Sequence, residues 1–446
     1  MVNKGVVWSL GRVFRETDEI YRFNLLPEEG HKRPAFINLQ QPYFEQYIVN
    51  EIRSQQAKGA PIDIRGKNLV TGLDPKDDHV VLDIETPEGS YQLIADWVVA
   101  ADGASSPVRE MMGLGFQGRV FEDNFLIADI HVETEFPVER RFWFNPPFNP
   151  GETALMHKQP DGIWRVDLQL GWNIDRKEEM QEERIKGRLR EALPGLEFKL
   201  EWTSIYTFRC CTMEKYRHGR VVFAGDSAHQ VSPFGARGAN GGMQDIDNLG
   251  WKLALVLQGK ASESLIDTYN SERKQAALEN IMNSSRSADF LTPRTPAHTL
   301  FRDAVLDLAE DNEFARPMVN SGRLSLPCTY DKSTLNGPDA EGLPSRTRPG
   351  SPLADAPLED GWFLEQTGNE FKILAFNTEA QPITVNDVTA SVLTLSTAKS
   401  PLLAERYLGD ADSAIYLLRP DQHIAARWTS ASEADIRAAL TTAMGG

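Results

Sequence analysis

A glycine-rich segment, GRVVFAGDSAHQVSPFGARGANGGMQDIDNLGWKLA at residues 219–254, constrains the fold of this chain more than any other feature. Its apolar run from Arg220 to Ala224 predicts a strand, and the acidic Asp226 follows directly after Gly225. Ligands of open α/β sheets bind outside the carboxyl ends of the strands, where a carboxylate accepts hydrogen bonds from sugar or polyol hydroxyls. The segment therefore predicts a ligand site at Asp226, although an ordinary strand, turn and helix is the simpler alternative.

The second half of this segment predicts a loop without bulky side chains that runs into a helix. The loop residues that would permit a close approach to a flat ligand are Pro233, Gly235, Gly238, Gly241 and Gly242. We expect the helix start, at residues 240–242, to offer unpaired N–H groups and the positive end of the helix dipole to negative charge. The residues that we expect along one face of this helix are Met243, Ile246, Gly250, Leu253 and Leu257.

Composition narrows the class of protein. The 446 residues are enough for two or three domains, and 41% hydrophobic with 25% charged residues is typical of a globular chain. The formal net charge of −17 argues against nucleic acid or an anionic membrane as a partner. No apolar run reaches the ~18 residues of a membrane span, and the N-terminus does not resemble a signal peptide. Cys210, Cys211 and Cys328 form neither a disulfide framework nor a metal site, so we expect a reducing cytoplasm.

The first half of the chain is predicted to contain one region of mixed helix and strand and one region of long strands. Residues 1–110 combine a helix at 43–57 with an acidic hairpin at 80–103. The helix residues that should face a core are Tyr43, Ile48, Val49 and Ile52. Residues 111–215 alternate apolar and polar side chains, which favours an antiparallel sheet. Its expected strands lie at 124–133, 140–145, 152–170 and 198–208.

The second half predicts a return to α/β structure. Residues 216–320 hold the strand, the glycine loop and further helices. Residues 321–359 are rich in Pro, Gly, Ser and Thr, which indicates a linker or a wrapped connection. Residues 360–446 alternate short strands with a terminal helix at 433–444, which is typical of a small α/β module. The chain as a whole is therefore expected to be of the mixed α/β (α+β) class.

One match to the dinucleotide-binding pattern G-x-G-x-x-G is interpreted as coincidental. It consists of Gly113, Gly115 and Gly118, which follow a helical segment and lead into an extended one. The pattern binds a pyrophosphate only when it leads from a strand into a helix, because the helix N-terminus supplies the N–H groups. We therefore do not expect a phosphate site there.

Two motifs together carry a family resemblance. ADGASSPVRE at residues 101–110 and the segment at 219–254 resemble the DG and GD motifs of the class A flavoprotein monooxygenases. The resemblance is to the branch of phenol hydroxylase and hydroxyphenylpropionate hydroxylase, and it extends over nearly the whole chain. It implies a Rossmann-like FAD-binding domain, a substrate-binding sheet domain at 111–215 and a thioredoxin-like C-terminal domain at 360–446. Because that last domain has no Cys-x-x-Cys, we expect packing within the chain or a homodimer contact rather than redox chemistry.

The resemblance also assigns roles to individual residues. Asp226 would accept hydrogen bonds from the ribityl chain of FAD, with Gly225 permitting the approach, and Gln41 matches the family glutamine near the flavin. The residues that would line the isoalloxazine ring are Pro233, Gly235, Gly238, Asn240 and Gly241. The residues that would support the pyrophosphate side and the encounter with the pyridine nucleotide are Asp102, Gly103 and Arg109. For Arg109, an ordinary exposed arginine on a helix surface is the alternative.

The reaction implied by the resemblance is hydroxylation of a phenolic or other activated aromatic ring with NADH or NADPH and O2. The strands at 120–215 would form the substrate pocket. Its candidate lining residues are His157, Trp164, Asp167, Tyr206 and Phe208. For each of these a purely structural role is the alternative, because strand aromatics and single histidines are commonly buried in a core.

The sequence departs from the family at one point. Family members begin with a strand, a G-x-G-x-x-G loop and a helix that hold the ADP part of FAD. We expect this unit to be missing from residues 1–446, so that the FAD-binding domain, at 1–110 and 216–320, is incomplete. Two other functions stay open: a flavin-free binding or oligomerisation protein, and a flavoenzyme of different chemistry such as epoxidation or dehydrogenation.

Overall fold

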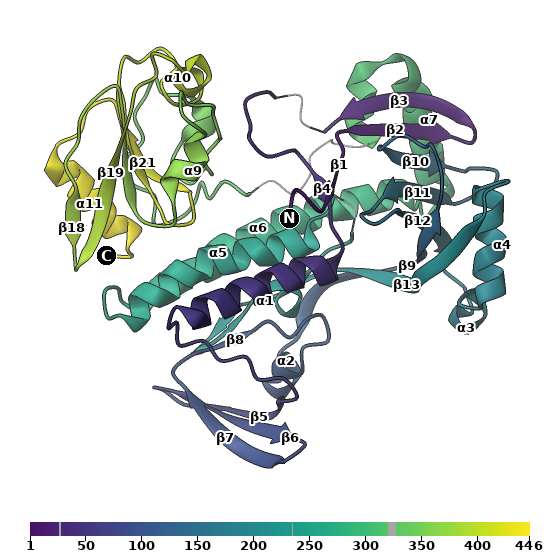
Figure 1. Cartoon of the computed structure of the whole chain (residues 1–446), viewed down its shortest axis with the longest axis horizontal. Coiled ribbons are helices and arrows are strands. Elements are labelled where there is room, and N and C mark those ends of the chain that lie inside the picture. The colour runs from purple at the N-terminus through teal and green to yellow at the C-terminus, as the bar shows by residue number, and fades with distance from the viewer. Residues whose placement is uncertain (26–27, 234, 320–326) are drawn as a thin grey trace.

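The computed structural model describes residues 1–25, 28–233, 235–319 and 327–446 (Figure 1). Its largest sheet has eight strands in the order β16-β13-β9-β12-β11-β10-β2-β3. Their bounds are β2 (Leu10–Arg15), β3 (Asp18–Asn24), β9 (Phe116–Val132), β10 (Arg140–Phe144), β11 (Thr153–Lys158), β12 (Ile163–Gly171), β13 (Phe198–Met213) and β16 (His229–Gln230). The strands predicted at 124–133, 140–145 and 198–208 are present, and the predicted antiparallel pairing is confirmed. The single strand predicted at 152–170 is instead a hairpin of β11 and β12, because Asp161 and Gly162 turn the chain with left-handed backbone conformations.

The expected boundary of the first domain is wrong at residues 10–24. These residues form β2 and β3, and β2 pairs in parallel with β10, so the large sheet includes an N-terminal hairpin. Val13 and Tyr21 are buried there with Phe144 and with α7 (Pro296–Asp311), which explains why the hairpin joins this sheet. The helical pair α3 (Arg176–Glu179) and α4 (Glu182–Ala192) follows β12, and Ile185 and Leu189 of α4 are buried in the core of the sheet's opposite face.

Two small sheets carry the motif loops. β8 (Val98–Ala100) and β15 (Val221–Phe223) pair in parallel, and β14 (Arg217–His218) completes that sheet. The predicted hairpin is confirmed as β6 (Val80–Thr86) and β7 (Gly89–Ala95), which form a separate sheet with β5 (Leu69–Pro75). Between them, α2 (Pro107–Met111) precedes β9, so Gly113, Gly115 and Gly118 lead from a helix into a strand as expected. The remaining pair of short strands is β1 (Val6–Val7) with β4 (Ile37–Asn38).

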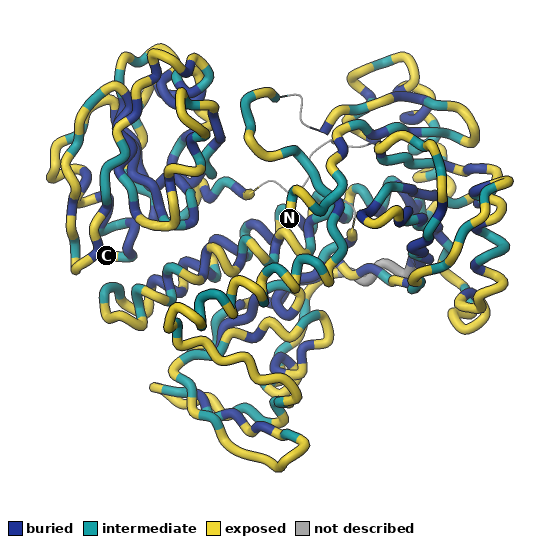
Figure 2. Tube along the Cα trace, in the orientation of Figure 1, coloured by how far each residue is buried: buried dark blue, intermediate teal, exposed yellow. Residues whose placement is uncertain are grey.

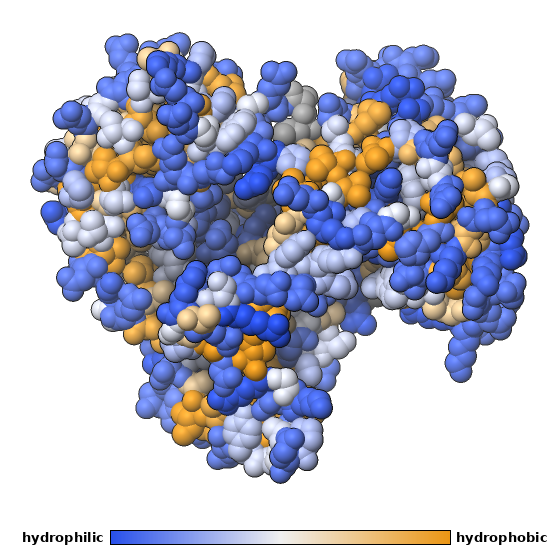
Figure 3. Space-filling model, viewed as in Figure 1, coloured by the Kyte–Doolittle hydropathy of each residue, from blue (hydrophilic) through white to orange (hydrophobic). Residues whose placement is uncertain are grey.

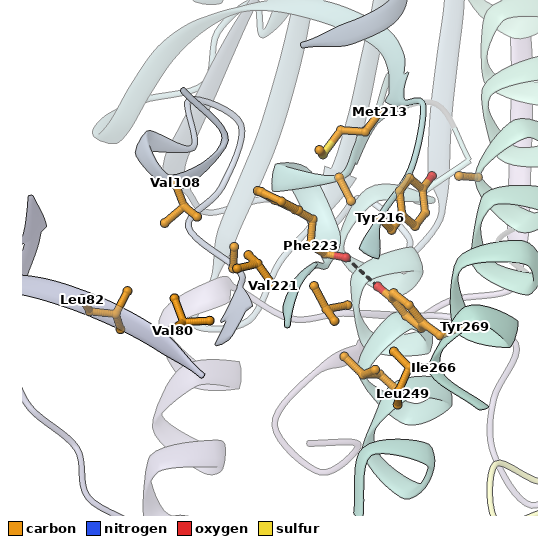
Figure 4. Close-up of a cluster of buried hydrophobic side chains, with 14 of the residues drawn as sticks. Val80, Leu82, Val108, Met213, Tyr216, Val221, Phe223, Leu249, Ile266 and Tyr269 are labelled. Carbon is orange, nitrogen blue, oxygen red and sulfur yellow. Dashed lines mark hydrogen bonds between the residues drawn. The ribbon is translucent and has the colours of Figure 1, made fainter. Parts of the chain in front are cut away.

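A buried cluster fixes β15 in the centre of this region (Figure 4). Val221 and Phe223 of β15 pack between residues of the small sheets and the two long helices α5 (Gly238–Leu257) and α6 (Ser264–Leu291). The Tyr269 hydroxyl of α6 donates a hydrogen bond of 2.8 Å to the Phe223 carbonyl oxygen. This packing determines where the loop after β15 leaves the core.

The residues of α1 that were expected to face a core are not buried, and α5 also has exposed apolar residues. Helix α1 (Gln41–Ala57) matches the predicted span, but it has no buried residue, and Ile48 is exposed. On α5, Met243, Ile246 and Leu257 are 45%, 46% and 56% exposed. Figure 2 shows exposed and buried residues alternating along the central helices. In Figure 3, hydrophobic side chains gather among hydrophilic ones in the centre of the face shown, where α1 lies in Figure 1. The buried face of α5 is instead largely polar. Its residues are Gly241, Asp245, Asn248, Leu249 and Lys252.

The C-terminal region forms a five-stranded sheet in the order β18-β19-β17-β20-β21. Its elements are α9 (Phe363–Thr367), β17 (Lys372–Phe376), β18 (Ile383–Val385), β19 (Val388–Leu395), α10 (Pro401–Tyr407), β20 (Ala414–Leu418), β21 (Ile424–Trp428) and α11 (Glu433–Ala443). The connection at 327–359 is wrapped around this sheet, because Gly337 and Gly350 donate backbone hydrogen bonds to Ala425 and Ile424. Residues 321–326 of the expected linker lie outside the described residues.

Two further findings concern ligands and membranes. Within the described ranges, no group of His, Cys, Asp or Glu side chains is arranged to hold a metal ion. None of the helices described here combines the length and the apolar character needed to cross a membrane. Helix α8 (Arg316–Val319) and three short 3-10 turns complete the described elements.

Candidate functional site

The two motif loops leave the same edge of the small parallel sheet. β8 and β15 run side by side in register from Val98 and Val221, so Asp102 and Asp226 both follow carboxyl ends of strands at that edge. The Ala224 N–H donates to the Ala100 carbonyl at 3.1 Å, and the Ser227 hydroxyl donates to the same carbonyl at 2.6 Å. The structure thus brings together the two motifs that the sequence separates by about 120 residues.

Arg109 joins these two loops from a buried position. Its guanidinium donates to the Ser227 carbonyl at 3.0 Å and to the Ala104 carbonyl at 2.9 Å, and lies 4.0 Å from the ring centre of Phe116. Gln230 adds a second link, because its amide donates to the Ala104 carbonyl at 3.0 Å. These contacts exclude the alternative of an exposed surface arginine for Arg109, which is only 6% exposed.

Asp102 and Gly103 shape the first loop. The Asp102 carboxylate accepts a hydrogen bond of 3.0 Å from the N–H of Val108, in the first turn of α2. Gly103 has φ +83°, a left-handed conformation that favours glycine. Ser106 caps α2 by accepting a hydrogen bond from the Arg109 N–H at 3.0 Å. The structure therefore gives Asp102 a role in the local fold of this loop.

Asp226 is exposed at the tip of the second loop, in the 3-10 turn Gly225–Ser227. Partial desolvation raises its pKa, Asp245 adds to this effect, and His229 opposes it. None of the described residues donates a hydrogen bond to the Asp226 carboxylate, and the Gln230 amide donates only to the Asp226 backbone carbonyl. A carboxylate in such surroundings is suited to accept hydrogen bonds from a ligand.

Gly225 serves a contact within the protein. It has φ +64°, and its Cα lies only 3.4 Å from where a Cβ on Gly242 would stand. Gly241 is similar, since a Cβ there would lie 3.5 Å from Cε1 of His229. These glycines therefore let the loop after β15 pack closely against the start of α5. The position of the loop is thus set in the free protein, without a ligand.

A residue that the sequence reasoning missed organises this loop. Asp245 of α5 is fully buried, and its carboxylate accepts hydrogen bonds from the Gly225 N–H at 2.8 Å, from His229 Nε2 at 2.7 Å and from Arg273 Nε at 2.6 Å. Burial alone would raise the pKa of Asp245, but His229 and Arg273 outweigh it and lower the pKa to about 2. The available signal was the recurrence of Asp245, Asn248 and Lys252 at helical spacing, which marks a polar buried face.

The start of α5 presents backbone groups rather than a capping side chain. The turn before it combines Gly235 at φ +86° with Ala236 at φ +53°, and the Ala236 N–H donates to the Pro233 carbonyl at 3.1 Å. No side chain of a described residue caps the helix at Arg237. The first N–H groups of α5, from Gly238 onward, therefore remain available for an acceptor with negative charge.

A cavity of about 640 Å³ reaches the start of α5 at Asn240. Its other lining residues come from the N-terminal segments and are Met1, Val2, Asn3, Arg33, Pro34, Ala35, Phe36 and Ile37. Asn240 itself donates to the Ala236 carbonyl at 2.7 Å. Gln41 lies exposed in the first turn of α1, where its amide donates to Glu45 at 2.7 Å, so Gln41 is not among the residues that line the cavity.

The expected pocket residues of the large sheet separate onto its two faces. Leu155 is paired with Asp167 and His157 with Arg165 in the register of β11 and β12, so Asp167 and His157 share one face. Trp164 points to the other face, where it is 2% exposed and packs edge-to-face on Phe136 at 5.8 Å. The structure therefore places Trp164 in the core beneath α4, because the residue at 164 alternates with those at 165 and 167.

The face with His157 and Asp167 holds polar atoms without partners. Within the described part of the chain, no hydrogen-bond partner exists for His157 Nδ1, Asp167 Oδ1 or Gln159 Oε1, all of which are buried. Burial raises the pKa of Asp167 to about 6. Burial, with help from Arg140 and Arg165, lowers the pKa of His157 well below its usual value. His157 is therefore neutral, and these atoms form an unsatisfied group.

The hydrogen bond between Gln159 and His157 assigns their roles. The Gln159 amide nitrogen lies 2.9 Å from His157 Nε2 and acts as the donor, so His157 Nε2 accepts and Nδ1 carries the ring proton. The unsatisfied group then contains one donor, at His157, and two acceptors, at Asp167 and Gln159. Sequence reasoning missed Gln159, because the sequence next to a turn does not show that this glutamine is buried.

Tyr206 and Phe208 lie farther along β13. Tyr206 is 44% exposed and its ring lies 6.4 Å from that of Trp202. Phe208 is buried against Phe125 at 4.9 Å and near Ala288 of α6. Phe208 thus contributes to the packing of the sheet against α6, whereas the ring of Tyr206 reaches solvent.

Comparison with known proteins links this geometry to flavoproteins. The family model described as "FAD binding domain" matches residues 11–284. The chain is 28% identical over 332 residues to 12-dehydrotetracycline 5-monooxygenase/anhydrotetracycline 6-monooxygenase of Streptomyces rimosus, covering 69% of this chain and 63% of the relative. It is 30% identical over 232 residues to 3-(3-hydroxy-phenyl)propionate/3-hydroxycinnamic acid hydroxylase of Escherichia coli strain K12, covering 52% of this chain and 41% of the relative.

Solved structures show the same fold. The flavin-dependent monooxygenase PieE, in complex with FAD and substrate, has a TM-score of 0.75 at 19% identity, with 98% of this chain and 86% of that chain covered. Aklavinone-11 hydroxylase, in a ternary complex with FAD and aklavinone, has a TM-score of 0.74 at 18% identity, with 99% and 87% covered. At these identities the solved structures establish the shared fold. The chain spans only part of the length of the curated relatives, 63% and 41% of the two named above.

Proposed function

Since this chain belongs to the FAD-binding-domain family, whose model matches more than half of its residues, we propose that it serves an FAD-dependent aromatic hydroxylase. The proposed reaction uses NADH or NADPH and O2 to hydroxylate a phenolic ring. The observation that carries the proposal is the pair of motif loops, joined by Arg109 and Gln230 at the carboxyl ends of β8 and β15. This edge of a parallel sheet is where open α/β folds bind their ligands.

The residues present fit the flavin end of FAD. Asp226 offers a carboxylate to which no described residue donates a hydrogen bond, and this suits the hydroxyls of the ribityl chain. The start of α5, which no described side chain caps, suits the negative charge of the flavin's pyrimidine edge. The residues proposed to line the ring are Pro233, Gly235, Gly238, Asn240 and Gly241. Gly225 and Asp102 act by shaping the two loops, and Gln41 and Gly103 stay proposed neighbours of the cofactor.

Bound FAD supplies the redox chemistry, and the protein has to bind and orient the aromatic substrate. We assign that task to the face of the large sheet that carries His157, Gln159 and Asp167. A phenolic hydroxyl is both donor and acceptor, so it matches a group with one free donor and two free acceptors. Arg140 and Arg165 also act on this face, because both lower the pKa of His157.

The same family likeness supports finer proposals on architecture. We propose that the sheet of β8 and β15 is the Rossmann-like part of the fold and that residues 360–446 are a thioredoxin-like domain without a redox role. The second proposal is supported by the five-stranded order of that sheet and by its lack of cysteine. The expectation that the ADP-binding turn is not among residues 1–446 stays a prediction.

Substitution of Asp226 tests the cofactor site. Asp226→Ala should weaken riboflavin and FAD binding about 10- to 100-fold, because each hydrogen bond to a charged group contributes roughly 1.5 to 3 kcal/mol. The free energy of unfolding should change little, since the side chain is exposed in the free protein. Fluorescence titration gives the affinity, and Glu191→Ala, which removes an exposed acid of α4, is the control. Equal flavin affinity in Asp226→Ala and the original chain would contradict the assignment.

A further inference from the structure

A second group of buried polar side chains joins the C-terminal sheet to the central helices. Arg419, in the turn between β20 and β21, donates to both carboxylate oxygens of Glu272 on α6, at 2.6 and 2.9 Å. It also donates to Asp421 of the same turn at 3.0 and 2.6 Å. On α5, Lys252 and Asn248 donate to Glu272 at 2.7 and 2.8 Å. The turn is therefore bonded to both long helices through one carboxylate.

The electrostatics of this group make its partners interdependent. Burial alone would raise the pKa of Glu272, but Arg419 and Lys252 lower it far below its usual value. Burial and Arg419 lower the pKa of Lys252 to about 8, against the opposing effects of Glu272 and Asp421. Each charge is compensated only while the others are in place. The position of α6 is accordingly fixed by the C-terminal turn.

The residue after Glu272 on α6 connects this group to the flavin loop. Arg273 is fully buried and donates to Asp245 at 2.6 Å, to the Gly241 carbonyl at 3.1 Å and to the Tyr330 hydroxyl at 2.8 Å. Tyr330 in turn stacks on His423 of the β20–β21 turn, with ring centres 4.7 Å apart. A continuous path of buried contacts therefore runs from His423 through Tyr330, Arg273 and Asp245 to the Gly225 N–H.

We propose that Tyr330 and the turn at residues 419–423 are positioning elements for the loop that holds the flavin. Tyr330 orients the Arg273 guanidinium, Arg273 orients the Asp245 carboxylate, and that carboxylate holds the Gly225 N–H and His229. The turn at 419–423 also holds α6, because Arg419 bonds to Glu272, the residue directly before Arg273. The C-terminal region thereby acts on the cofactor site in addition to packing on α5, where Trp251 meets Phe371 edge-to-face at 5.5 Å.

This inference rests on the proposed function for the identity of the ligand, whereas the coupling itself is a property of the protein alone. The test uses Tyr330→Phe in residues 1–446, because this change removes one hydroxyl and leaves the ring stacked on His423. Tyr416→Phe is the matched control, since it removes an equally buried hydroxyl of the C-terminal sheet, bonded to the Tyr407 carbonyl at 2.6 Å.

The first readout is amide hydrogen exchange of the peptide spanning β15 and the loop to Gln230, measured without flavin. Tyr330→Phe should accelerate exchange of the Gly225 N–H about tenfold, which corresponds to about 1.4 kcal/mol in the opening equilibrium. Tyr416→Phe should leave it unchanged. The second readout is riboflavin affinity, which should fall in Tyr330→Phe by a similar factor.

The outcomes separate the two proposals. Unchanged exchange in Tyr330→Phe, or equal acceleration in Tyr416→Phe, would overturn the coupling. Faster exchange in Tyr330→Phe alone supports the coupling, even if the original chain binds no riboflavin, a result that would overturn the proposed function instead. Faster exchange together with weaker riboflavin binding supports both.

Discussion

The flavin loop and the face of the large sheet that carries His157 each depend on an aspartate of a regular element, yet the two carboxylates have opposite surroundings. Asp245 accepts three hydrogen bonds from protein groups, and its pKa is lowered to about 2. Asp167 has an oxygen with no partner in the described part of the chain, and burial raises its pKa to about 6. The Asp245 carboxylate therefore maintains the structure of the loop, whereas the Asp167 carboxylate is available to a ligand.

Removal of the Asp245 carboxylate should destabilise the protein, because the hydrogen bonds with its partners inside the protein would be lost. Asp245→Ala leaves the buried Arg273 guanidinium without its carboxylate, and the loss of one partner of a buried pair costs about 3 to 5 kcal/mol. We expect the free energy of unfolding, measured by urea denaturation, to fall by that amount. Glu191→Ala, which removes an exposed acid of α4, should change it by less than about 0.5 kcal/mol. Similar small effects of both changes would show that the loop does not depend on Asp245.

Asp167→Asn should have a smaller effect of the opposite sign. Because the pKa of Asp167 is raised in the folded state from 3.8 to about 6, the original chain loses stability relative to the variant as pH rises through that interval. At pH 8 the variant should be more stable by up to about 3 kcal/mol, because each tenfold change in proton affinity corresponds to about 1.4 kcal/mol, and below pH 4 the difference should vanish. Denaturation at several pH values measures this difference.

The control for that prediction lies on the same face. Asp129 is bonded to Arg165 through both oxygens, at 2.7 and 2.8 Å. Asp129→Asn should therefore destabilise the protein at pH 8, in contrast to Asp167→Asn. If both variants lose stability alike, the carboxylate of Asp167 is as well satisfied as that of Asp129, and the comparison fails.

The smallest expected effect concerns the ADP part of FAD. If the phosphate-binding turn is not among residues 1–446, the chain has contacts for the flavin end alone. Riboflavin and FAD should then bind with dissociation constants equal within a factor of about 3, which is less than 1 kcal/mol. Isothermal titration with each ligand gives the two constants. A hundredfold preference for FAD would show that these residues do hold the ADP part.

The sequence predicted the local elements well because their signals are local. Apolar periodicity and turn residues indicate the strand before Asp226, the helix at 41–57 and the strands between 124 and 208. The pairing of the two motifs was accessible through the family resemblance. The parallel pairing of β2 with β10 was not, because nothing near residues 10–24 specifies a partner more than 100 residues away.

The missed site residues show where local reasoning fails. The apolar residues of α5 were expected along one face, and of these Met243 and Ile246 are exposed, whereas the buried face carries Asp245, Asn248 and Lys252. A polar residue becomes favourable in a core only when partners from other segments satisfy it, and those partners, Arg273 and Glu272, lie on another helix. Trp164 was misplaced for a simpler reason, since a shift by one residue along a strand reverses the face.

Hydrogen exchange with and without riboflavin tests the central claim most directly, because it locates the flavin on the chain. We expect riboflavin to slow exchange in the peptides that cover the loop at 225–230 and the start of α5 at 235–242. Peptides of β11 and β12 should show no change in the absence of an aromatic substrate. Protection confined to the C-terminal sheet, or no protection at a riboflavin concentration that saturates binding, would contradict the assignment of the flavin site.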